Sequence, residues 1–210
     1  MSRIIDVSQP VGSRTAVWPG DQRVAVVWTL RRDRGDSVNV AALTMSAHTG
    51  THADGPLHVD DAGAVPAALD LTPYLGPAIV VDATCHDVLD RNAVADLDLT
   101  RVTRILFRTR ERTDSRQFPD RFTPLAPDLA RWIGQAGVKL VGTDAPSVDP
   151  FHSKTLDAHH ILGNAGVAIL ENLVLDDVEP GHYTLVALPL SLVEADSSPV
   201  RAVLVEGTIG

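Results

Sequence analysis

One stretch of eleven residues, 48–58, concentrates side chains that bind metal ions. It reads His-Thr-Gly-Thr-His-Ala-Asp-Gly-Pro-Leu-His and contains three histidines and one aspartate. An even spread of the chain's eight histidines would place only about 0.4 of them in a window of this length. Imidazole and carboxylate groups together suit zinc and other divalent transition metals. The stretch therefore predicts a metal site built from His48, His52, Asp54 and His58.

The backbone of this stretch must curl for these side chains to meet. His48 and His52 are four residues apart, which on a helix would place them on one face, but Gly50 and the Gly-Pro pair at 55–56 disfavour a helix. A straight strand would separate the first and the last histidine by about 33 Å. We therefore expect a strand that ends near Ala47, followed by a curled segment whose glycines allow a close approach to a small ion. The alternative is an ordinary turn at the Asp-Gly-Pro sequence.

Further candidate ligands lie in the second half of the chain. His159 and His160 are adjacent on a short helix predicted over residues 155–163, and either could reach the metal. Glu171 follows the apolar run 167–170, which predicts a buried strand. Burying a carboxylate beside such a run costs free energy unless it pairs with a cation or binds a metal ion. The end of a buried strand is also a common place for functional groups. The alternative for Glu171 is a solvated strand end.

Trp18 is the main candidate for a contact with an organic ligand. It precedes a Pro-Gly turn in the loop-like segment 8–21, and aromatic residues are only 4% of the chain. An indole in this setting is either a lid over the core or a flat platform for an aromatic ligand.

Length and composition indicate one domain over residues 1–210, large enough for a substantial core. The net charge of −9 disfavours nucleic acid and anionic membranes as partners. Cys85 is the single cysteine, which excludes an internal disulfide framework and is compatible with a reducing compartment. Because the first residues lack an apolar region and no apolar run reaches membrane-spanning length, we expect a cytoplasmic protein.

The pattern of apolar residues predicts a mixed α/β or α+β fold in which strands outnumber helices. A helix is expected over 124–136, with Thr123 as N-cap, Pro124 in the first turn and Gly137 as the stop. A shorter helix is expected over 88–97. The expected strands are 3–7, 23–30, 38–47, 77–82, 103–108, 139–143, 167–170 and, as the last clear one, 183–190.

Several segments together resemble the cyclase-like metal-dependent hydrolase family, and within it the formamidases. The histidine motif at 48–54 is typical of the whole family, and Val-Trp-Pro-Gly-Asp at 17–21 narrows the resemblance. The remaining matching segments are 142–150, 153–160, 168–171 and 188–202. The resemblance runs nearly end to end.

The resemblance implies a swivelling β/β/α domain, a homodimer or larger assembly, and two divalent ions, generally zinc. It assigns His48, His52 and Asp54 to the first ion, with Asp54 also reaching the second. The family's distal histidine and glutamate lie twelve residues apart, as His159 and Glu171 do, which favours His159 over its neighbour. It further implies that His58 is the acid/base residue and that Trp18 contacts the substrate.

The implied reaction is hydrolysis of N-formyl-L-kynurenine to L-kynurenine and formate, a step of tryptophan degradation. Divalent ions lower the pKa of bound water and stabilise charge on a carbonyl oxygen, and His58 has a suitable pKa to protonate the leaving nitrogen. Three alternatives stay open. The chain could hydrolyse a cyclic amide such as isatin with one manganese ion, or it could bind metal without catalysis, although His58 would then be a spare base. A serine hydrolase is disfavoured because no Gly-x-Ser-x-Gly sequence is present.

Overall fold

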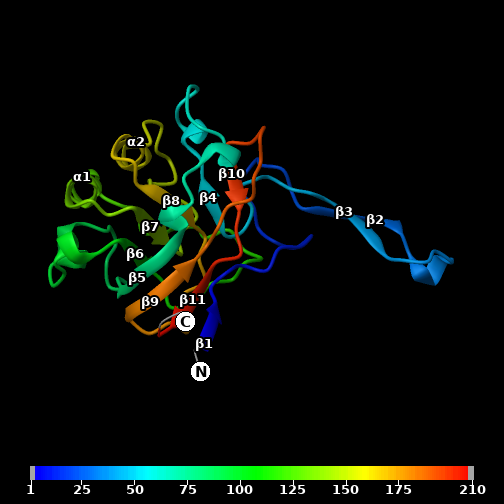
Figure 1. The fold of residues 1–210 in the computed structure, drawn as a ribbon, viewed down its shortest axis with the longest axis horizontal. Helices are drawn as coiled ribbons and strands as arrows, with labels where there is room; N and C mark the ends of the chain where they lie inside the picture. Colours follow the sequence, from blue (N-terminus) through cyan, green and yellow to red (C-terminus); the bar gives the residue numbers. More distant parts are fainter. Residues whose placement is uncertain (1–2, 208–210) are drawn as a thin grey trace.

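The computed structural model describes residues 3–207, and in this part of the chain nine strands form one mixed sheet (Figure 1). These strands are β1 (Arg3–Asp6), β4 (His52–Asp54), β5 (Leu75–Asp82), β6 (Arg104–Arg108), β7 (Leu140–Thr143), β8 (Ala168–Glu171), β9 (Gly181–Val186), β10 (Ser197–Pro199) and β11 (Val203–Glu206). Their order across the sheet is β1-β11-β9-β5-β6-β7-β8-β4-β10. Strands β5 to β8 pair in parallel, whereas the strands on either side pair antiparallel.

Two helices cover one face of the parallel strands: α1 (Pro127–Ala136) and α2 (Asp157–Asn164) (Figure 1). Side chains of a strand point alternately to the two faces, so Ile105 and Phe107 of β6 pack with the helices. Leu106, between them, joins the apolar cluster on the other face. Both faces of the parallel strands are therefore buried. No helix in residues 3–207 is long and apolar enough to cross a membrane.

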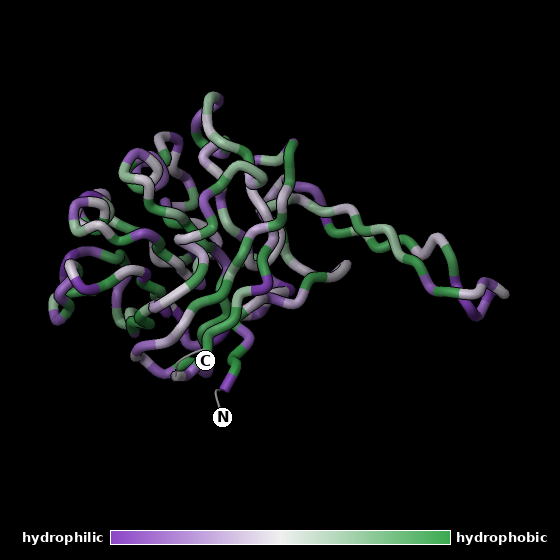
Figure 2. Tube along the Cα trace, in the orientation of Figure 1, coloured by the Kyte–Doolittle hydropathy of each residue, from purple (hydrophilic) through white to green (hydrophobic). Residues whose placement is uncertain are grey.

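A two-stranded hairpin projects from this body, as Figures 1 and 2 show. It consists of β2 (Ala25–Leu30) and β3 (Val40–Thr44), which pair only with each other. Every residue of both strands is exposed. We call residues 25–44 the arm.

The predicted mixed α/β class is confirmed, and each predicted strand has a counterpart within a few residues. The helix predicted over 124–136 begins later, at Pro127, with Ala126 as N-cap, so the assignments of Thr123 and Pro124 were wrong. The reason is that Leu125 forms a bridge with Leu89, which keeps this part of the chain extended. Gly137 ends the helix in the left-handed conformation, as expected.

Two other expectations need correction. The helix predicted over 88–97 is reduced to one 3-10 turn, Arg91–Val94. The last strand is β11 and not the segment 183–190, because β10 and β11 follow it. The other 3-10 turns are Arg32–Arg34, Pro56–His58, Pro66–Ala68, Thr72–Tyr74 and Leu99–Arg101.

Candidate metal centre

The short strand β4 presents two of the predicted ligands side by side. His52 and Asp54 flank Ala53, so both side chains point to the same face of the sheet. Strand β4 pairs antiparallel with β8, and the register places His52 directly opposite Glu171. All three polar residues are buried. Sheet pairing therefore joins the histidine motif to a carboxylate that is more than a hundred positions away in the sequence.

Helix α2 contributes His159, whose imidazole faces the same carboxylates. His159 Nε2 lies 3.4 Å from Asp54 Oδ2 and 3.4 Å from Glu171 Oε1. His52 Nε2 lies 3.4 Å from Asp54 Oδ1 and 3.4 Å from Glu171 Oε2. His48 Nδ1 lies 3.2 Å from Asp54 Oδ1. Three histidines thus surround the carboxylates of Asp54 and Glu171.

The separations between these atoms fit metal coordination better than direct hydrogen bonding. Charge-assisted hydrogen bonds are about 2.7–2.9 Å long, and the contacts here are longer. Two ligand atoms about 2.0–2.1 Å from a tetrahedral zinc ion would lie about 3.3 Å apart. Among the described residues, both carboxylate oxygens of Asp54 and Nε2 of His52 are buried without a hydrogen-bond partner. Such orphaned atoms are costly, and a cation would satisfy all three.

The candidate ligands fall into two groups that share one carboxylate. One group is His48, His52 and Asp54, and the other is Asp54, His159 and Glu171. Within each group the ligand atoms lie within 4.8 Å of one another. The two oxygens of Asp54 face different partners, Oδ1 toward His48 and His52 and Oδ2 toward His159. The arrangement can hold one ion or two that share Asp54.

The close packing of histidines and carboxylates shifts the pKa values of both. Burial alone would raise the pKa of Asp54, but His159, His48 and His52 hold that pKa well below its usual range. Burial alone would lower the pKa of His52, but Asp54 and Glu171 raise it to about 10. The pKa of His159 is likewise raised against the effect of burial. The cluster therefore favours positive charge among its carboxylates.

Hydrogen bonds to Nδ1 fix the orientation of the two buried histidines, His52 and His159. Asp149 Oδ2 accepts a hydrogen bond from His159 Nδ1 at 2.6 Å, and its two oxygens also accept from the backbone N–H groups of Ala158 and His159. His52 Nδ1 donates to the carbonyl oxygen of Gly50 at 2.9 Å. Each bond occupies Nδ1 and leaves Nε2 facing the cluster. Partners of this kind orient metal-binding histidines in many proteins.

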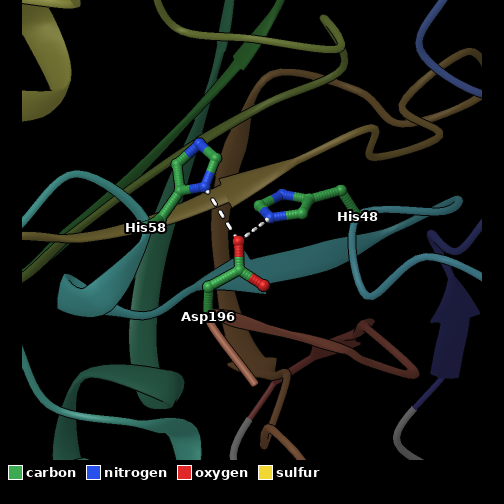
Figure 3. Close-up of side chains that lie close together, drawn as sticks. All are labelled: His48, His58 and Asp196. Atoms are coloured by element: carbon green, nitrogen blue, oxygen red, sulfur yellow. Dashed lines mark hydrogen bonds and ion pairs between the residues drawn. The ribbon is translucent and has the colours of Figure 1, made fainter. Parts of the chain in front are cut away.

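His58 lies next to the cluster but outside the two groups that share Asp54. It ends the 3-10 turn Pro56–His58 and is partly exposed. Its Nδ1 lies 3.1 Å from Oδ2 of Asp196, which also lies 2.9 Å from Nε2 of His48 (Figure 3). The rings of His48 and His58 have centroids 4.3 Å apart.

A cavity of about 280 Å³ opens onto the metal centre, near the lower end of the ~300–1,000 Å³ typical of ligand sites. Its walls include Trp18 and Phe118 together with four of the site histidines and Glu171. The Trp18 ring packs edge-on against Phe118 and is tilted against Phe151, with centroids 5.3 and 5.1 Å apart. Trp18 is 36% exposed. One side of the cavity is thus aromatic and the other carries the candidate ligands.

The structure brings together every residue that the sequence singled out for this site. It also decides between the two adjacent candidate ligands, because His159 is buried in the cluster and His160 is exposed. Glu171 is 4% exposed, so the alternative of a solvated strand end was wrong. Sequence reasoning missed Asp149 and Asp196, although both lie in the segments 142–150 and 188–202 that carried the family resemblance.

The chain is similar to known proteins over most of its length. A family model described as "Putative cyclase" matches residues 5–150. The chain is 43% identical over 203 residues to a kynurenine formamidase of Bacillus cytotoxicus, with 97% of each chain covered. It is 47% identical over 204 residues to a kynurenine formamidase of Salinibacter ruber, with 96% of each covered.

Solved structures share the fold. One described as a potential metal-dependent hydrolase with cyclase activity superimposes with a TM-score of 0.87 at 30% identity, over 100% of both chains. Isatin hydrolase A of Labrenzia aggregata superimposes with a TM-score of 0.81 at 23% identity, over 97% of this chain and 93% of that one. The second similarity concerns the fold alone.

Proposed function

The chain belongs to the cyclase family, and we propose that it acts as a kynurenine formamidase, hydrolysing N-formyl-L-kynurenine to L-kynurenine and formate in tryptophan degradation. The observation that carries this proposal is the identity of 43% and 47% to two kynurenine formamidases over nearly the whole chain. The similarity spans both halves of the candidate metal centre. The buried histidine and carboxylate cluster supports a metal-dependent hydrolase.

The proposal includes two divalent ions, with zinc as the first choice. His48, His52 and Asp54 would hold one ion, and Asp54, His159 and Glu171 would hold the other. Histidine and carboxylate donors in this number suit zinc. When bound, such ions would lower the pKa of a bound water and polarise the formyl oxygen of the substrate.

The remaining steps depend on the protein's own side chains. The aromatic wall at Trp18 and Phe118 supports binding of the substrate's ring, because flat rings pack well against one another. Hydrolysis breaks the bond between the formyl carbon and the aniline nitrogen, and that nitrogen is a poor leaving group as an anion. His58 lines the cavity beside the metal centre and would take up a proton and donate it to this nitrogen as its bond to the formyl carbon breaks.

We also propose a homodimer that forms through the arm. Val26, Trp28 and Leu43 lie on one face of the hairpin, because Val26 pairs with Leu43 and residues two apart share a face. They are 43%, 47% and 57% exposed. An isolated two-stranded hairpin is at best marginally stable in water, so contact with a second copy would supply the missing packing.

The proposal also covers the β/β/α arrangement of the domain, the kind of partner and the location in the cell. The nine-stranded mixed sheet with α1 and α2 on one face supports the swivelling β/β/α arrangement. The net charge of −9 supports a small-molecule substrate over nucleic acid or membrane as partner. A cytoplasmic location is compatible with a single, exposed cysteine, Cys85.

A second candidate reaction is the opening of a cyclic amide such as isatin. Two isatin hydrolases share the fold but are only 23% and 17% identical to this chain, which makes this the weaker candidate. The test is to incubate zinc-loaded protein with either compound and to measure formate from N-formylkynurenine and ring opening of isatin. We expect formate release with a much higher kcat/KM; preferential opening of isatin would contradict the proposal.

A further inference from the structure

Asp196 reaches the edge of the candidate metal centre although it is remote from the histidine motif in the sequence. It directly precedes β10, and β10 pairs antiparallel with β4, with Ser197 opposite Asp54. The backbone N–H of Gly55 donates to the carbonyl oxygen of Asp196 at 2.8 Å. An added Cβ at Gly55 would lie 2.8 Å from that oxygen, which is closer than real Cβ contacts. The close pairing of two backbones thus brings the Asp196 carboxylate to the site.

One oxygen of this carboxylate contacts two functional histidines. Oδ2 lies 2.9 Å from His48 Nε2 and 3.1 Å from His58 Nδ1, as Figure 3 shows. Since a carboxylate accepts hydrogen bonds, His48 Nε2 and His58 Nδ1 would each carry a hydrogen. For His48 this leaves Nδ1, which faces Asp54, as the free ligand atom. For His58 it leaves Nε2, which points away from Asp196 (Figure 3).

The three side chains could also be read as a separate metal site, since their ligand atoms lie within 4.8 Å of one another. The geometry favours hydrogen bonding instead. The two distances, 2.9 and 3.1 Å, are normal for hydrogen bonds and shorter than the separations of 3.2 to 3.4 Å around Asp54. The Asp196 side chain is 44% exposed, whereas that of Asp54 is 5% exposed. Exposed carboxylates need no cation for compensation.

We propose that Asp196 is a positioning residue for the hydrolysis, and that it acts through His58. By accepting from Nδ1, it fixes the ring orientation and leaves Nε2 as the atom that takes up a proton and gives it to the leaving nitrogen. By also accepting from His48, it holds His58 at a fixed distance from a ligand of the metal centre. This inference rests on the proposed function, because it concerns the proton that the aniline nitrogen receives.

The local structure explains why His58 needs such a partner. It sits on a single 3-10 turn, and in residues 3–207 Asp196 is the only side chain with a hydrogen bond to its ring. The His58 side chain is 30% exposed, so water would compete for a ring that lost this bond. His52 and His159, in contrast, are buried and held by Gly50 and Asp149.

The first test compares Asp196→Asn with Glu194→Gln. Both changes remove one negative charge from the same loop, but Glu194 is exposed and lies outside the candidate site. We expect Asp196→Asn to lower kcat for N-formylkynurenine about 10–100-fold, the usual effect of losing a partner that orients a site histidine. Measured with zinc at saturation, KM and melting temperature should stay close to wild type, and Glu194→Gln should match wild type throughout. Recovery of the wild-type kcat by Asp196→Asn at saturating zinc would overturn the proposal, because Asp196 would then act only through the metal.

The second test asks whether Asp196 acts through His58. His58→Ala alone should lower kcat about 10²–10⁴-fold, and adding Asp196→Asn to it should cost little more, since effects of residues that act as a unit are not additive. An aryl formate ester, whose phenolate leaves without a proton, should be hydrolysed almost normally by Asp196→Asn. Additive losses, or an equal loss with the ester, would overturn the proposal. Wild-type protein that releases no formate from N-formylkynurenine would instead overturn the proposed function.

Discussion

At the scale of single residues, the candidate site combines neighbours in sequence with residues that only folding brings close. His48, His52, Asp54 and His58 could be predicted because they share one short stretch with two glycines. Asp149 and Asp196 could not, because an aspartate in a loop is common and its role depends on its partner. The partners of Asp196 lie 148 and 138 positions away. No local pattern records a contact of that kind.

Trp18 leads to a first prediction at this scale. Its ring packs against Phe118 and Phe151 at the cavity wall, and aromatic pairs contribute roughly 0.5–1.5 kcal/mol beyond area burial. We expect Trp18→Ala to lower kcat/KM for N-formylkynurenine about tenfold or more, since tenfold corresponds to about 1.4 kcal/mol. Zinc content should not change. The same measurement with a small aliphatic formamide is the control, and an equal loss for both substrates would mean that Trp18 only packs the loop.

The protonation of His52 leads to a second prediction. Asp54 and Glu171 raise its pKa to about 10 in the metal-free protein against the effect of burial, so it carries a proton at neutral pH. Because zinc binds the neutral imidazole, binding must release this proton. Apparent zinc affinity should therefore fall as pH falls, by about tenfold per pH unit for each proton released. Competition with a chromophoric chelator at pH 6, 7 and 8 measures this, and an affinity independent of pH would contradict it.

At the scale of elements, the site is built where short strands and one helix end meet. The strands β4 and β10 are only three residues long, too short to show a clear apolar period. The sequence therefore predicted the apolar β5, β6, β7 and β8 but missed β4 and β10. It also placed the start of α1 at Pro124, because the bridge between Leu89 and Leu125 that delays the helix leaves no local signal.

The N-terminus of α2 leads to a third prediction. Its N-cap, Leu156, adopts a left-handed conformation and offers no side-chain cap. Asp149 takes this role, accepting from the backbone of Ala158 and His159 and from the His159 ring. We expect Asp149→Asn to weaken zinc binding about 10–100-fold and to lower the melting temperature. Zinc titration and thermal unfolding measure these effects.

The control for Asp149→Asn is Asp157→Asn, which removes an exposed carboxylate from the first turn of the same helix. It should leave zinc affinity close to that of wild type. If both variants lost zinc affinity equally, the effect would come from charge near the helix end and not from orientation of His159.

At the scale of the whole molecule, the arm is the feature that the isolated chain leaves without packing (Figures 1 and 2). Its two strands were predicted from their β-branched and apolar residues, but the sequence did not show that they would stand apart from the main sheet. Strand pairing with distant segments decides that, and the pattern of a strand is the same whichever sheet it joins.

The arm leads to a fourth prediction. Replacing the exposed Trp28 by glutamate places a charge in the apolar face of the hairpin, and a charge buried without a partner in an interface is strongly unfavourable. We expect wild-type protein to sediment as a dimer at micromolar concentration and Trp28→Glu to shift toward monomer. Val193→Glu, which introduces the same charge at a position that is 71% exposed outside the arm, should leave the dimer intact. A wild-type monomer would rule out the proposed assembly.

The central claim is that a metal centre built from both halves of the chain hydrolyses N-formylkynurenine. The most direct measurement follows formate release by purified protein before chelation, after exhaustive chelation and after return of zinc, with metal content determined at each stage. Among the described residues, both carboxylate oxygens of Asp54 and Nε2 of His52 are buried without a hydrogen-bond partner, as the ligands of an ion would be. Since such ions would activate the attacking water, we expect the metal-free protein to lose activity. Added zinc should restore it. Full activity in protein shown by elemental analysis to be free of metal would contradict the account.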